Sequence, residues 1–138
     1  MKTTILVLAN KTARSDELFD ALAARAATAP IRLDFVAPPE RFDPAARAEA
    51  QQRLDEALQR AHDAGWEATG QIGDCDALTA VVEAYDPRRH DEIIVATLPP
   101  SLSVWLRIDL PRQIARATNA LVNDVQVSER RPAGVRAH

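Results

Sequence analysis

The chain has 138 residues and a mass of 15.1 kDa, which is close to the commonest size of one domain. Its 17 Lys and Arg residues against 20 Asp and Glu residues give a formal net charge of −3, so nucleic acid and anionic membranes are not expected partners. The single cysteine excludes an internal disulfide, and no apolar stretch approaches the length of a membrane span. We therefore expect a globular cytoplasmic protein.

The first half of the chain predicts strands that alternate with helices. Residues 3–9 form a nearly continuous apolar run, which is typical of a strand buried on both faces of a parallel sheet. Ser15 can cap the helix that follows, and residues 31–36 predict a second strand. Asp43 followed by Pro44 then indicates a helix start, because a carboxylate caps free N–H groups and proline suits the first helical position.

The second half of the chain repeats this alternation. Gly70 and several polar residues dilute its first strand, which favours a place at the edge of the sheet, whereas its second strand is strongly apolar. The predicted elements are a strand at 67–72, a helix capped by Asp74 or Asp76, a strand at 92–97, a helix at 110–118 and a strand at 121–127.

This alternation predicts an α/β, Rossmann-like fold: a five-stranded parallel sheet in the order 3-2-1-4-5 with helices on both faces. We expect one domain at residues 1–127 and a flexible tail at 128–138. In such a sheet the crossover direction reverses between strands 1 and 4, and ligands bind there at the carboxyl ends of the strands. The loops at 10–14 and 97–109 therefore flank the expected site.

Three segments resemble the universal stress protein family, with its adenine nucleotide alpha hydrolase-like fold. TILVLANKT at 4–12 resembles the first strand and its turn, GDCDA at 73–77 the start of the third helix, and DEIIVAT at 91–97 a later strand. Together they cover about residues 3–127. The segment ATLPPSLSVWLRIDLP at 96–111 is similar to a signature of an actinobacterial subgroup that lacks the glycine-rich ATP motif.

The resemblance also bears on nucleotide binding, because the family contains members that bind ATP and members that do not. Binders use a Gly-x-x-Gly motif, with Gly and Ser or Thr about nine residues later. Here the two glycine positions fall on Thr97 and Pro100, and Asn10 replaces the aspartate that meets the ribose. Pro99 and Pro100 have no N–H and a fixed φ, so they cannot form the backbone cradle that phosphates need. ATP in the family pose is therefore disfavoured.

Side chains of the crevice loops offer a substitute anion site, in which hydroxyls and guanidinium groups replace backbone donors. In the alternative interpretation the serines cap a helical turn and the arginines pair with Asp109 or solvent. Trp105 is interpreted as an apolar plug, with stacking on a base as the alternative. The candidate ligand-binding residues are Asn10, Val36, Thr97, Ser101, Ser103, Arg107 and Arg112.

No sequence motif indicates catalysis or a metal site. Asp74 and Asp76 are interpreted as helix caps rather than metal ligands. His62 lies on a charged helix and His90 in a polar turn, and neither has a partner pattern for metal binding or general-base work. Cys75 has no histidine nearby in the sequence. We therefore expect no catalytic residue, no metal and no enzyme activity.

The sequence favours a non-catalytic, universal-stress-protein-like protein that acts through dimerisation or a partner and has a remodelled nucleotide site. No cofactor is expected. The alternative is a sensor that binds ATP, AMP or another phosphate ligand in the crevice between strands 1 and 4. An apolar last strand at a sheet edge also favours pairing with a second copy. We therefore expect a homodimer, with Val122, Val125 and Val127 as candidate interface residues.

Overall fold

The computed structural model describes residues 2–98, 105 and 108–127. Five parallel strands form one sheet in the order β3-β2-β1-β4-β5, which confirms the predicted topology. The strands are β1 (Thr3–Leu8), β2 (Ile31–Ala37), β3 (Glu67–Ile72), β4 (Glu92–Thr97) and β5 (Val122–Gln126). The helices bounded within the described residues are α1 (Asp16–Ala26), α2 (Pro44–Asp63), α3 (Ala77–Ala84) and α5 (Leu110–Thr118).

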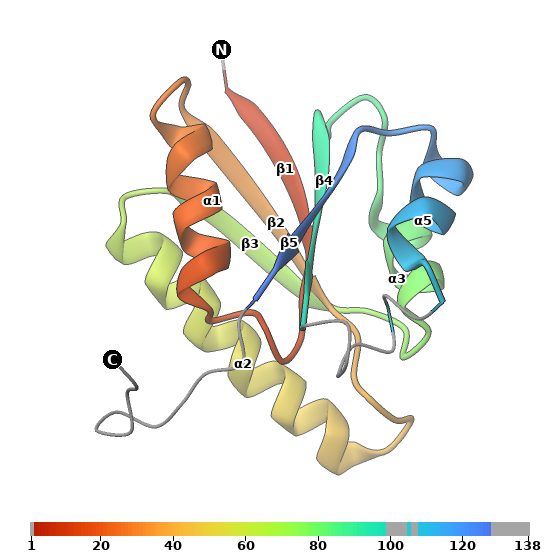
Figure 1. Cartoon of the computed structure of the whole chain (residues 1–138). Coiled ribbons are helices and arrows are strands. Elements are labelled where there is room, and N and C mark those ends of the chain that lie inside the picture. Colours follow the sequence, from red (N-terminus) through yellow and green to blue (C-terminus); the bar gives the residue numbers. More distant parts are fainter. Residues whose placement is uncertain (1, 99–104, 106–107, 128–138) are drawn as a thin grey trace, which may run out of the picture.

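The helices cover the two faces of the sheet in pairs. Figure 1 shows α1 and α2 on one face and α3 and α5 on the other. Successive side chains of a strand point to opposite faces, so β1 supplies Ile5 and Val7 to the first core and Leu6 and Leu8 to the second. Every residue of β4 is buried as well. The two most apolar strands of the sequence therefore lie inside the sheet, as predicted.

Local sequence signals fix where the helices begin and end. The Ser15 hydroxyl accepts a hydrogen bond from the Leu18 N–H at 3.2 Å, and the Asp43 carboxylate accepts one from Ala46 at 2.7 Å. These bonds satisfy N–H groups that have no partner inside the helix. Gly65 follows α2 with a φ of +83°, a left-handed conformation that glycine adopts without a steric cost.

The topology brings the carboxyl ends of three strands together at one edge of the sheet. Val7 of β1 lies opposite Phe35 of β2 on one side and opposite Ile94 of β4 on the other. Because the chain leaves β1 toward β2 and later returns on the other side to form β4, a crevice opens between the loops that follow β1 and β4. The site was predicted at this edge.

Candidate functional site

A cavity of roughly 510 Å³ lies at the carboxyl edge of the sheet. Its described wall is assembled from the residues that follow β1 and β2, the start of α3, the end of β4 and the region that begins α5. This volume falls within the range of about 300–1,000 Å³ that is typical of small-molecule sites. The cavity therefore has the place and the size expected of a ligand site in an α/β sheet.

Most of the described cavity wall is apolar. Trp105 is partly buried, packs against the core beneath α3 and α5, and also faces the cavity. The packing agrees with the interpretation of Trp105 as an apolar plug. Because the ring also faces the cavity, it is in a position to stack on the base of a ligand. The other apolar lining residues are Pro38, Pro39, Ala77, Leu78, Ala96, Leu98, Ile108 and Leu110.

Asn10 lies in the cavity wall directly after β1, but its amide is engaged by the protein itself. The side-chain nitrogen donates to the carbonyl of Pro38 at 2.7 Å, and the side-chain oxygen accepts from Arg53 at 2.9 Å. Asn10 is only 5% exposed. A ligand hydroxyl that bonds to Asn10 would therefore have to share or replace one of these two contacts.

A charged pair bridges the segments that follow β1 and β2. The Lys11 ammonium lies 2.9 Å from a carboxylate oxygen of Glu40, and both side chains line the cavity. The hydrogen bond from Lys11 outweighs burial and lowers the pKa of Glu40, so this carboxyl stays ionised at neutral pH. Sequence reasoning missed both residues, although Lys11 lies in the loop that was expected to flank the crevice.

Asp76 is the third charged residue of the described cavity wall. Its carboxylate accepts hydrogen bonds from the Thr79 N–H at 3.0 Å and the Thr79 hydroxyl at 2.6 Å, which makes it the N-cap of α3. Asp74 accepts instead from the Asp76 N–H at 2.8 Å. The predicted capping role is therefore confirmed for Asp76, whereas Asp74 bonds to the residue before the helix. Cys75 is exposed and also lines the cavity.

The other predicted ligand-binding residues that are described do not line the cavity. Val36 is fully buried in the core under α3, and the Thr97 hydroxyl donates a hydrogen bond to Asp124 at 2.7 Å. Arg112 is exposed and lies 3.3 Å from Asp109, as in the alternative interpretation of the arginines. Three further candidates lie outside the described residues: Ser101, Ser103 and Arg107.

The candidate dimer residues of β5 pack against the protein's own core. Val122 contacts the core under α3 and α5, Val125 contacts the core under α1 and α2, and Val127 is only 7% exposed. Leu121, which the sequence placed at the start of this strand, lies just before it and is 63% exposed. An approaching copy would meet the backbone edge of β5, the exposed Leu121 and the parts of Val122 and Val125 that the core leaves uncovered.

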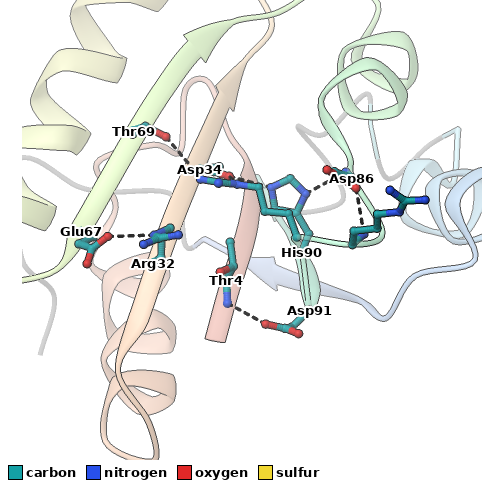
Figure 2. Close-up of polar contacts among 10 residues, drawn as sticks. Thr4, Arg32, Asp34, Glu67, Thr69, Asp86, His90 and Asp91 are labelled. Atoms are coloured by element: carbon teal, nitrogen blue, oxygen red, sulfur yellow. Dashed lines mark hydrogen bonds and ion pairs between the residues drawn. The ribbon is translucent and has the colours of Figure 1, made fainter. Parts of the chain in front are cut away.

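A second polar cluster lies away from the cavity and joins β2, β3 and the turn before β4 (Figure 2). Asp34 accepts hydrogen bonds from Thr69 at 2.7 Å, from Arg89 at 2.8 Å and from His90 at 2.8 Å. The other ring nitrogen of His90 accepts from the Asp86 N–H at 3.0 Å, so the ring proton is assigned to Nε2.

This cluster gives His90 a structural role that the sequence did not indicate. The sequence placed His90 in a polar turn without a partner pattern for metal binding or general-base work; in the structure its side chain is only 3% exposed and is bonded on both ring nitrogens. Burial alone would raise the pKa of Asp34, but the hydrogen bonds from Arg89, Thr69 and His90 outweigh it and hold that pKa well below its usual range. Because both ring nitrogens are occupied, the geometry is that of a structural link.

Within the described residues, no three His, Cys, Asp or Glu side chains gather closely enough to hold a metal ion. In the same part of the chain, no helix combines the length and the apolar character needed to cross a membrane.

Comparison with known proteins defines the class of fold. No protein-family model and no curated protein matches the chain. A universal stress protein solved in complex with cAMP is 24% identical, with 91% of this chain and 98% of that chain covered and a TM-score of 0.62. A universal stress protein from Archaeoglobus fulgidus in complex with dAMP is 18% identical, with 89% and 97% covered and a TM-score of 0.60.

A third solved structure is a protein of the universal stress protein family from Burkholderia pseudomallei. It is 19% identical, with 89% of this chain and 95% of that chain covered and a TM-score of 0.58. The chain therefore has the fold of universal stress proteins, with the same Rossmann-like parallel sheet.

Proposed function

We propose that this protein is a cytoplasmic member of the universal stress protein family that acts by binding rather than by catalysis, and that its cavity takes a small adenine nucleotide such as AMP. The observation that carries the proposal is the cavity of roughly 510 Å³ at the strand ends beside β1 and β4. Two proteins of the same fold were solved with cAMP and dAMP, which supports this ligand class.

The proposed ligand carries one phosphate because the features of this chain argue against ATP in the family pose. Pro99 and Pro100 stand where the family needs backbone donors, and proline has no N–H to give. Two carboxylates and one ammonium group line the described wall, so its formal charge is negative. A polyphosphate would meet more repulsion there than a monophosphate. The proposed site is thus a remodelled form of the family's site.

Tryptophan fluorescence tests this proposal directly, because the chain has two tryptophans and only Trp105 lines the described cavity wall. Trp66 stacks on Phe19, with ring centroids 6.1 Å apart, in the core under α1 and α2. In a Trp66→Phe variant, AMP should change the Trp105 emission in a saturable way. Adding Trp105→Phe should abolish the signal. No saturable change at millimolar AMP or adenosine would refute the proposed ligand class.

A label-free experiment completes the test. We expect denatured, freshly purified protein to release an adenine nucleotide, or the purified protein to gain thermal stability with AMP and less with ATP. A larger shift with ATP than with AMP would show that the site is not remodelled in the proposed way.

We further infer that the protein forms a homodimer through β5. Among the strands that the structure describes, β5 pairs with β4 alone, and the adjoining Leu121 is 63% exposed. An unpaired strand edge is a template for pairing with another chain. Light scattering after size exclusion should give the dimer mass for the wild type and more monomer for Leu121→Glu. A wild-type monomer at high micromolar concentration would refute the inference.

A further inference from the structure

The charged side chains of the cavity wall differ in how firmly other parts of the protein hold them. Among the described lining residues, Lys11 is the only cation, and the two anions are Glu40 and Asp76. Asp76 is committed to the first turn of α3 through two hydrogen bonds from Thr79. Among these three charged groups, the interaction that can change without loosening a helix is therefore the one between Lys11 and Glu40.

The ion pair between Lys11 and Glu40 can be replaced by an ion pair between Lys11 and a ligand anion. The Lys11 side chain is 55% exposed and that of Glu40 is 35% exposed, so water already solvates much of both groups. Exposed ion pairs contribute little to stability, and another anion can therefore replace Glu40 at small cost. Glu40 keeps a second cation when Lys11 leaves, because Arg41 lies 3.7 Å from its other carboxylate oxygen.

We propose that Lys11 binds the phosphate of the cavity's ligand and that Glu40 is the internal anion that this phosphate displaces. This inference rests on the proposed function, since it assumes that a nucleotide enters the cavity. It adds a selection rule: a phosphate must compete with a carboxylate that is attached to the site. Competition of this kind lowers the affinity for every anionic ligand and leaves a neutral nucleoside unaffected.

Calorimetric titration with adenosine and AMP separates nucleotide binding as such from the exchange of partners at Lys11. Lys11→Met should weaken AMP by about five- to tenfold, because one charge-assisted contact is lost, and should leave adenosine within about twofold. Glu40→Gln should tighten AMP by about two- to fivefold, because the competing carboxylate is gone. The matched control is Lys2→Met, which removes the chain's other lysine. Lys2 lies just before β1, is exposed and forms an ion pair with Glu67.

The two lysines also give a spectroscopic readout that a merely structural role would not move. Reductive methylation with a ¹³C label keeps the ammonium charge and should produce two lysine signals, which Lys11→Met assigns. AMP should shift the Lys11 signal and leave Lys2 unchanged, whereas adenosine should shift neither. Equal urea midpoints for the variants and the wild type would show that they are folded.

The outcomes are distinct. If neither adenosine nor AMP binds the wild type, the proposed function fails and the inference fails with it. If both ligands bind the wild type, the proposed function stands. The exchange of partners is then refuted if Lys11→Met lowers the affinity for adenosine and for AMP equally, or if Glu40→Gln lowers the affinity for AMP.

Discussion

Replacing Asp34 with asparagine tests the view that the polar cluster of Figure 2 is a structural link. The substitution keeps the shape of the side chain but leaves one acceptor oxygen where the carboxylate has two. The new NH₂ group must then face an Arg89 donor on either side, together with Thr69 at one position or with His90 at the other. His90 cannot adapt by moving its proton to Nδ1, because that nitrogen already accepts from the Asp86 N–H.

The magnitude follows from the contacts of Asp34. Hydrogen bonds to a charged partner contribute about 1.5–3 kcal/mol each when buried. The hydrogen bonds from Arg89 contribute less than this range because its side chain is 43% exposed to water. The His90 side chain is only 3% exposed, so its hydrogen bond contributes nearly the full amount. We therefore expect Asp34→Asn to lower the free energy of unfolding by about 2–3 kcal/mol at pH 7.

Urea denaturation followed by circular dichroism between pH 7 and pH 3 measures this effect and its cause. The pKa of Asp34 is lower in the folded protein than in the unfolded chain, so its stabilisation is present above the unfolded pKa of about 3.9 and is lost as the pH falls below it. The difference between wild type and Asp34→Asn should thus be constant down to about pH 5 and shrink below about pH 4.

The matched control is Asp55→Asn on α2, where the carboxylate is exposed and accepts a hydrogen bond from Gln51 at 2.9 Å. It should change the free energy of unfolding by less than about 0.5 kcal/mol at every pH. An Asp34→Asn variant as stable as this control, or a difference that does not shrink in acid, would contradict the structural role of the cluster.

Three further substitutions probe other parts of the structure, each measured by urea denaturation. Glu92→Gln should cost about 2–3 kcal/mol, because Glu92 is 8% exposed and holds Arg25 at 2.7 Å, whereas Glu56→Gln in an exposed pair should cost less than about 0.5 kcal/mol. Gly73→Ala should cost about 1–3 kcal/mol, since its Cβ would lie 2.7 Å from a side chain of α3; an unchanged midpoint would show that α3 shifts freely. Phe42→Ser should leave the free energy of unfolding within about 0.5 kcal/mol, because Phe42 is 96% exposed, and a larger loss would mean that its ring packs in solution.

The sheet could be predicted from the sequence because its signals are local and repeated. The apolar runs of β1 and β4 predicted burial on both faces of the sheet. The Asp43–Pro44 pair predicted the start of α2 at the residue where the helix begins. Once five strands alternate with helices, the handedness of crossovers leaves few possible strand orders. The place of the cavity followed from that order rather than from any residue that lines it.

The polar contacts could not be predicted in the same way, because they join residues far apart in the chain. Asp34 and His90 are separated by 56 positions, and the alternation of Asp34 with Leu33 and Phe35 is typical of a strand with one solvent-facing side. Lys11 and Glu40 meet only because β1 and β2 are neighbours that end at the same edge. A pairing register, which the sequence does not state, was needed to bring each pair together.

The segmented wall of the cavity has a consequence for how a ligand would be held. Its described parts follow β1, β2 and β4 and begin α3 and α5, so they are joined to one another through the sheet rather than along the chain. Local opening of any one segment would break the enclosure while the strands stay paired. Residence time would then be set by the most weakly anchored segment, and a bound ligand would slow amide hydrogen exchange in several loops at once while leaving the sheet unchanged.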